Sequence, residues 1–306
     1  MSHGVAFEVS WCVIACMESE LAPPGRVYDS VRRKHMNPHR DPQGYGSVYE
    51  QFNSPVMRKV REEAYGEDIG QHSWVTAEEL TEDITRLQLS GATRLMDLGC
   101  GPCGPLTFIV ARIGCHATGA DSSAGAIAAG KLRAASLDLD GRVHLIQADL
   151  NEPVPFPDKS FEAILSLDVV LHLRDRFQMF QEVARVLAPG GRFLFTDAAV
   201  LTGAISDDEV QRRATFGPVQ FAPSGLNETL LADAGLLLLE QHDRTASLLR
   251  NASGRIAARK SHQAELEKLE TPAGFARQQT YLETVLALSQ RGALSRRMYL
   301  AELPGK

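Results

Sequence analysis

Short apolar runs that alternate with helical patterns constrain the fold of this chain more than any other feature. Each run has the length of a buried strand. The runs stand at 94–98, 116–120, 143–147, 163–167 and 192–196, and the helical patterns that separate them at 105–113, 123–137 and 175–187. Because strands that alternate with helices form parallel sheets covered on both faces, ligands are expected at the carboxyl ends of the strands.

Two more helices are predicted before the first strand. One spans 53–65. The other begins at Thr76, which has the spacing of a capping box with Glu79, and runs to about Ser90. The segment 18–45 is rich in proline, arginine, histidine and glycine, which predicts a loop or an arm.

The pattern changes after the fifth strand. Ser206 opens a short helix, and strands are predicted at 236–239 and at 296–303. Two helices between these strands, 246–270 and 272–290, form an insertion. We interpret the insertion as a lid over the active site. The alternatives are that it only packs on the sheet or that it forms the surface of a homodimer.

These patterns predict a doubly wound, Rossmann-like α/β fold with a mostly parallel seven-stranded sheet and a reversed last strand. The N-terminal arm and a helical cover occupy 1–75, and the Rossmann-like core occupies 76–200. The rest of the sheet, with the helical lid insertion at about 245–291, occupies 201–306. No internal repeat divides the chain further.

The segment after the first strand is a glycine-rich loop. Gly99, Gly101 and Gly104 have the spacing G-x-G-x-x-G between a strand and a helix. Glycine is favoured there because the turn is tight and because the backbone approaches a ligand closely. The spacing alone does not identify the ligand, since nicotinamide and flavin enzymes use the same loop.

Three aspartates narrow the choice of ligand. Asp97 stands two residues before the first glycine, Asp121 ends the second strand and Asp149 follows the third. With these residues, the segment 65–200 resembles the class I S-adenosylmethionine-dependent methyltransferases. The resemblance implies that S-adenosylmethionine is the cofactor and that the reaction is methyl transfer to a small molecule.

The resemblance also implies a role for each residue of the site. The glycine loop would hold the methionine part of the cofactor, Asp121 both ribose hydroxyls and Asp149 the adenine amino group. Trp74, which precedes the second helix, would cover the cofactor. The residues implied to contact the cofactor are Asp97, Gly99, Gly101, Gly104, Asp121, Ser122, Asp149, Leu150, Leu167 and Trp74.

Two other functions fit parts of the pattern. A NAD-dependent oxidoreductase would also place an acid such as Asp121 on a ribose. However, Asp149 and the Pro-Gly-Gly turn at 189–191 favour the methyltransferase. The third reading is a cofactor-binding scaffold without catalysis, which only a turnover assay distinguishes from an enzyme.

The segment after the fourth strand carries the candidate catalytic residues. Asp168 and His172 are four apart and would share one helical face if the chain turns there. The segment resembles phosphoethanolamine N-methyltransferases, which implies an aspartate that contacts the cofactor and a histidine that belongs to a catalytic dyad. The tyrosine of that dyad has no counterpart here, because the equivalent stretch reads Phe52-Asn53-Ser54.

A methyl acceptor must lose its proton, so a positioned base assists the transfer. We predict His172 as that base, and the alternative is a structural histidine. The resemblance favours nitrogen over oxygen as the acceptor atom, and methylation of carbon stays open. Three tyrosines of the arm are candidates to close the active site, namely Tyr28, Tyr45 and Tyr49.

The composition limits the partners of the chain. The formal charge is −6, whereas nucleic-acid phosphates are held by clustered lysine and arginine. We therefore expect no nucleic-acid partner. Arg212 and Arg213 share a helix with three acids, so we interpret them as solvated charges; the alternative is that they meet an anionic substrate. The sequence has no apolar window of about 20 residues, so no membrane helix is expected.

The cysteines indicate a reducing, cytoplasmic setting. Five cysteines in 306 residues are unlike a disulfide framework. Cys100 and Cys103 have the C-x-x-C spacing of redox and zinc sites, but both lie inside the glycine loop. A structural zinc site needs four ligands, and no second ligand pair stands nearby, so we expect no metal.

Overall fold

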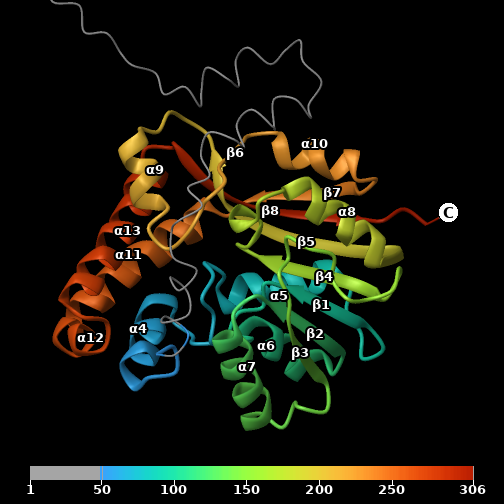
Figure 1. Ribbon diagram of the computed structural model, residues 1–306, viewed down its shortest axis with the longest axis horizontal. Helices are drawn as coiled ribbons and strands as arrows, with labels where there is room; N and C mark the ends of the chain where they lie inside the picture. The colour runs from blue at the N-terminus through green and yellow to red at the C-terminus, as the bar shows by residue number, and fades with distance from the viewer. Residues whose placement is uncertain (1–48, 50, 306) are drawn as a thin grey trace, which may run out of the picture.

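The computed structural model describes Tyr49 and residues 51–305 as a sheet with helices on both faces (Figure 1). The strands are β1 Arg94–Leu98, β2 His116–Asp121, β3 Val143–Gln147, β4 Phe161–Leu167, β5 Leu187–Leu201, β6 Ala222–Pro223, β7 Leu237–Asp243 and β8 Leu294–Glu302. They run in the order β3-β2-β1-β4-β5-β8-β7, and β6 pairs with β5. Because β8 alone runs antiparallel to its neighbours, the predicted sheet with a reversed last strand is confirmed. The two-residue β6 was not predicted.

Helices cover both faces of the sheet. One face packs against α5, α6 and α7, and the other packs against α8 and α10. The remaining helices, α4, α9, α11, α12 and α13, gather at one end, on the left of Figure 1. The helices are α4 Pro55–Tyr65, α5 Ala77–Leu87, α6 Gly104–Ile113, α7 Ala124–Ser136, α8 Arg176–Val186, α9 Asp207–Arg213, α10 Leu226–Asp233, α11 Thr245–Ser261, α12 Gln263–Glu270 and α13 Pro272–Gln290, with a 3-10 turn η2 at Val170–His172.

Burial on both faces explains the continuous apolar runs that marked the strands. Side chains of a strand alternate between its two faces. In β1, Leu95 joins the cluster with α5 to α7, whereas Met96 and Leu98 join the cluster with α8. Neither face of the central strand is therefore open to solvent, and a ligand can reach it only at an end.

Two helix bounds differ from the sequence predictions. The helix that begins after Thr76 ends at Leu87 rather than near Ser90, because Gln88 takes the left-handed conformation with a φ of 54°. The predicted helix 246–270 is two helices, α11 and α12, which separate at His262. Neither Gln88 nor His262 is a glycine or a proline. The helical periodicity of the sequence therefore gave no indication that a helix ends at these residues.

A fully buried arginine of β8 joins three distant parts of the chain. Arg296 donates to the Glu79 carboxylate of α5 at 2.8 Å and to the Asp168 carboxylate, just after β4, at 3.0 Å. Its backbone amide donates to the hydroxyl of Thr245, the first residue of α11, at 3.1 Å. The Glu79 contact also corrects the predicted capping box. The Thr76 hydroxyl accepts from the Glu79 amide at 3.1 Å, but the carboxylate binds Arg296 instead of returning to the cap.

The insertion between β7 and β8 packs against the N-terminal part of the described chain. Val60 of α4 packs with Phe275 of α13, and Trp74 packs with Leu248 of α11. A Cβ on Gly254 would lie 2.8 Å from the Ala64 carbonyl oxygen, so glycine allows α11 and α4 to approach closely. Among the described residues, no helix combines the length and apolar character needed to cross a bilayer.

Candidate active site

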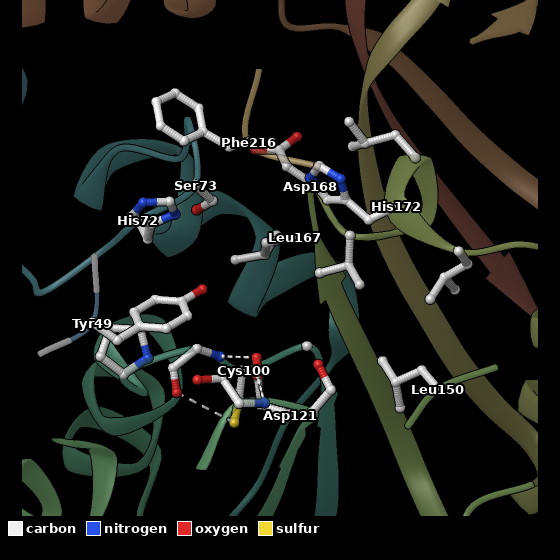
Figure 2. Close-up of a pocket in the computed structure, with 18 of the residues that line it drawn as sticks. Tyr49, His72, Ser73, Cys100, Asp121, Leu150, Leu167, Asp168, His172 and Phe216 are labelled. Carbon is white, nitrogen blue, oxygen red and sulfur yellow. Dashed lines mark hydrogen bonds between the residues drawn. The ribbon is translucent and has the colours of Figure 1, made fainter. Parts of the chain in front are cut away.

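A cavity of about 240 Å³ lies at the carboxyl ends of the parallel strands, where this class of fold places ligands. Nearly every residue predicted for the site lines it. These residues are Trp74, Asp97, Gly99, Gly101, Asp121, Ser122, Asp149, Leu150, Leu167, Asp168 and His172. Gly104 is the one predicted residue that does not. Figure 2 shows Cys100 and Asp121 at the lower end of the cavity and Asp168, His172 and Phe216 at the upper end.

Backbone hydrogen bonds fix the glycine loop to the end of β2. The amides of Gly99 and Cys100 donate to the Ala120 carbonyl at 2.8 and 3.1 Å. Gly99 has a φ of 78°, and a Cβ there would collide with the Val169 side chain. A Cβ on Gly104 would instead collide with the carbonyl oxygen of Gly70. The lack of a side chain at Gly104 therefore allows the segment around Gly70 to pack directly against the glycine loop.

Two carboxylates face the lower part of the cavity. Asp121 accepts from the Gly101 amide at 2.9 Å and from the Ser123 amide at 2.8 Å, and burial raises its pKa. Burial, together with the charge of Asp121, raises the pKa of Asp97 to about 8. A carboxyl group in this state is ready to ionise when a cation arrives.

Asp149 stands at the exposed rim of the same cavity. Its carboxylate accepts from the Asn151 amide at 2.9 Å and from the Asn151 side chain at 2.7 Å, which forms a local turn. The neighbouring Leu150 and Asn151 also line the cavity. This end therefore offers one polar edge beside an apolar surface.

The Asp168 carboxylate is held from three sides. It accepts from the Trp74 amide at 2.9 Å, from the Thr196 hydroxyl at 2.8 Å and from Arg296 at 3.0 Å. Asp168 has a φ of 58° and precedes the turn that contains His172. The two side chains do not share a helical face as the spacing predicted, because Asp168 lies outside the turn.

His172 is held at the end of η2. Its Nδ1 lies 3.1 Å from the Pro218 carbonyl oxygen. Burial, with the nearby charge of Arg213, lowers the pKa of His172 to about 4. The imidazole is therefore neutral at pH 7, and the tautomer that donates from Nδ1 to Pro218 has the lone pair on Nε2.

Two further residues of the cavity come from the segment before α5. Tyr49 and His72 line the cavity, with their ring centroids 5.5 Å apart. Burial and the charges of Arg255 and Arg61 lower the pKa of His72 to about 3. Tyr49 was a candidate to close the site and does reach it, whereas Tyr28 and Tyr45 lie outside the described residues. His72 was not singled out from the sequence.

The prediction for Arg213 was wrong. Arg212 forms an exposed ion pair with Asp208, as expected of a solvated charge, but Arg213 is only 3% exposed and lines the cavity. Arg255 of α11 and Tyr281 of α13 line it as well. No sequence motif indicated Arg255 or Tyr281.

The two cysteines of the glycine loop lie close together beneath the cavity. Cys103 is buried with a φ of 62°, and its Sγ lies 3.5 Å from that of Cys100. Cys100 lines the cavity, whereas a Cβ on Gly130 would meet the Cys103 sulfur at 2.7 Å. Both side chains fill space between the loop, β2 and α7.

The sequence was compared with known proteins. A family described as "Methyltransferase domain" matches residues 96–195. The methyltransferase GfsG of Streptomyces halstedii is 34% identical over 131 residues, 42% of this chain and 46% of that protein, so the chain spans less than half of this relative. The 27-O-demethylrifamycin SV methyltransferase of Amycolatopsis mediterranei is 30% identical over 207 residues, 64% of this chain and 74% of that protein. The chain belongs to the class I S-adenosylmethionine-dependent methyltransferases.

Solved structures agree with the fold of this methyltransferase. Phosphoethanolamine N-methyltransferase 2 of Haemonchus contortus, solved with phosphomonomethylethanolamine and S-adenosylhomocysteine, is 17% identical with a TM-score of 0.72. The match covers 84% of this chain and 59% of that one. The methyltransferase uses S-adenosylmethionine as its cofactor, and the oxidoreductase alternative is not favoured.

Proposed function

We propose that this methyltransferase transfers the methyl group of S-adenosylmethionine to a nitrogen or oxygen atom of a small-molecule acceptor. The observation that carries the proposal is that one cavity joins the glycine loop and its aspartates to two half-buried histidines, His72 and His172. The first group of residues suits a cationic nucleoside. The second suits an acceptor that must lose a proton.

The polar groups at the lower end of the cavity fit the cofactor. The carboxylates of Asp97 and Asp121 can accept hydrogen bonds from an ammonium group and from ribose hydroxyls. Asp149 at the rim can accept from an adenine amino group, with Leu150 against the ring. Trp74, which is 4% exposed and stacks on Tyr281, would cover the cofactor from the side of the acceptor.

His172 is the proposed base. When bound, S-adenosylmethionine supplies an electrophilic methyl group on a sulfonium sulfur. The acceptor attacks with a lone pair, so its N–H or O–H proton must leave, and the neutral His172 can take it. The low pKa of His172 keeps its imidazole in the receptive form over the whole neutral range.

Asp168 acts as a positioning residue in this proposal. Its carboxylate binds the Trp74 amide and Arg296, so it fixes the segment that covers the cofactor against the end of β4. The Trp74 amide, the Thr196 hydroxyl and Arg296 already bind its carboxylate oxygens. We therefore assign the proton transfer to His172 rather than to Asp168.

Calorimetric titration with S-adenosylmethionine, S-adenosylhomocysteine and NAD tests the cofactor part. We expect micromolar binding of the first two compounds and none of NAD. Asp121→Ala should weaken binding at least tenfold, because a charged acceptor to two hydroxyls is lost. Asp140→Ala, which removes an exposed aspartate outside the cavity, is the matched control. Equal affinities in both variants would contradict the role of Asp121.

Turnover with a panel of small amines, phenols and acids tests the catalytic part. We expect mass-spectrometric detection of a methylated product together with S-adenosylhomocysteine. A chain that binds both cofactor forms but methylates no member of a broad panel would favour the non-catalytic scaffold.

A further inference from the structure

Two arginines line the cavity, and neither has a carboxylate partner among the residues that the structure describes. We propose that they bind an anionic oxygen group, such as a carboxylate or a phosphate, carried by the methyl acceptor. The inference rests on the proposed function, because it names the substrate class of the same site. The arginines are Arg213 of α9 and Arg255 of α11.

Arg213 differs from the other buried arginines of the described chain. Each of the others has a carboxylate within ion-pair distance; they are Arg61, Arg176, Arg259 and Arg296. Arg213 has none among the described residues. Its Nη2 donates only a long hydrogen bond of 3.4 Å to the Ala198 carbonyl, and its Nε has no hydrogen-bond partner.

An unpaired buried guanidinium is costly, because the charge has lost its water without gaining a counterion. Proteins keep such a group where a ligand supplies the missing charge, and the planar guanidinium matches carboxylate and phosphate oxygens in pairs. The unpartnered Nε and the position in the cavity wall point to this use of Arg213.

Aromatic rings connect the two arginines. The Arg213 guanidinium lies 5.2 Å from the ring centre of Tyr281, and the Arg255 guanidinium lies 5.0 Å from that of Trp74. Trp74 and Tyr281 are themselves stacked, with ring centroids 6.5 Å apart. Arginine, tryptophan, tyrosine and arginine thus form one wall of the cavity, and no ion pair among the described residues involves either guanidinium.

This wall belongs to the acceptor end of the cavity. Phe216 contacts Tyr281 edge to face, with centroids 5.3 Å apart. Figure 2 places Phe216 at the upper end of the cavity, as it does Asp168 and His172, and away from Asp121. Arg213 is also close enough to His172 to lower its pKa. Since the rings of Trp74, Phe216 and Tyr281 line the cavity beside the arginines, the acceptor is an organic anion with an aromatic or apolar body.

The methionine carboxylate of the cofactor is the competing anion. It would draw the arginines toward the glycine loop, whereas Arg213 lies close to His172 at the other end of the cavity and Arg255 lies close to His72. The two sources are separated by measuring cofactor affinity and anion affinity in the same variants.

The test uses benzoate, phenyl phosphate and neutral benzamide as probes, titrated at constant ionic strength into the full chain saturated with S-adenosylhomocysteine. We expect both anions to bind at least roughly tenfold more tightly than benzamide. Arg213→Gln and Arg255→Gln should each remove most of that preference and leave the S-adenosylhomocysteine affinity within about twofold.

Matched controls come from the same helices. Arg212→Gln changes the exposed neighbour on α9, and Arg250→Gln changes an exposed arginine of α11; both should bind benzoate like the wild type. Thermal unfolding identifies any variant that fails to fold, and the comparison of anionic with neutral probes on the wild type needs no variant.

Three results would overturn the proposal. The first is equal or absent binding of the anionic and neutral probes by the wild type. The second is an unchanged anion preference in both folded variants. The third is a parallel loss of S-adenosylhomocysteine affinity, which would assign the arginines to the cofactor. A wild-type chain that does not bind S-adenosylhomocysteine would instead contradict the proposed function, and probe titration of the cofactor-free chain would still decide on the arginines.

Discussion

Cofactor binding should release a proton from Asp97 near neutral pH. Burial and the charge of Asp121 raise the pKa of Asp97 to about 8, so at pH 7 about 90% of this carboxyl group is protonated. S-adenosylmethionine carries an ammonium and a sulfonium group, and a cation next to a carboxyl group favours its ionised form. Binding should therefore ionise Asp97 and release about 0.9 proton from it at pH 7.

The same linkage makes the affinity depend on pH. Below pH 8, lowering the pH by one unit adds about 1.4 kcal/mol to the free energy needed to ionise Asp97. The free cofactor also has an α-amino group, whose usual pKa is about 7.8, and it begins to lose its proton in this range. With both groups included, the affinity should be roughly eightfold tighter at pH 7 than at pH 6 and should level off near pH 8.

Calorimetry in phosphate and in Tris measures the proton release directly, because the two buffers differ in their heat of ionisation. Asp97→Asn should bind with almost no proton release at pH 7 and with nearly equal affinity at pH 6 and pH 7. Asp140→Asn, outside the cavity, should behave like the wild type. Proton release that persists in Asp97→Asn would refute the reasoning, since some other group would then be titrating.

Three further predictions concern stability and turnover. Arg296→Met should lower the free energy of unfolding in urea by about 3–5 kcal/mol, because two buried carboxylates lose their counterion. Arg94→Gln breaks an exposed ion pair and should lower the same free energy by less than about 1 kcal/mol. Equal losses in the two variants would contradict the argument. His172→Gln should lower turnover about 100-fold or more while cofactor affinity changes less than twofold. Because the pKa of His172 is about 4, wild-type turnover should show no histidine step near pH 6.5, and such a step that disappears in His172→Gln would contradict the lowered pKa of His172. Gly104→Ala should cost about 1–3 kcal/mol of unfolding free energy by overpacking, whereas Gly141→Ala, with nothing near its Cβ, should change it little.

The parts of the fold that could be predicted are those with local causes. The strand at 94–98 is apolar because both of its faces are covered. The glycines after it are required by the backbone conformation of a single turn. Asp121 and Asp149 reach one cavity because parallel strands end at one edge of the sheet. Each of these signals lies within a few residues of the feature that it predicts.

The parts that could not be predicted depend on contacts between distant segments. Asp168 is oriented by Arg296, 128 residues further along the chain. Gly104 faces Gly70 because the segment before α5 lies across the loop. In neither of these pairs does the sequence around one residue indicate which distant residue it contacts.

The helical spacing around Arg213 indicates that this residue is buried, whereas the number of acids on the helix indicates a solvated charge. Val210 is partly buried against a hydrophobic cluster, and Arg213 follows it by three residues, so both share one face of α9. Arg212 is four residues from Asp208 and shares the other face. Helical spacing, rather than the number of acids on the helix, separates the buried arginine from the solvated one.

The hydrogen bonds around Arg296 limit how an acceptor can enter and leave the cavity. The first turn of α11 is joined to β8 by the Thr245 hydroxyl and by the Arg244 amide, which donates to the Arg296 carbonyl at 2.8 Å. A motion that lifted α11 as a whole would break both bonds and expose the buried ion pairs behind them. Entry is therefore easier if α11 pivots on this fixed base, so that its far end, with α12 and the start of α13, swings away from α4. Hydrogen exchange should then be slow at the base of the insertion and faster toward Thr271, where the two distal helices meet.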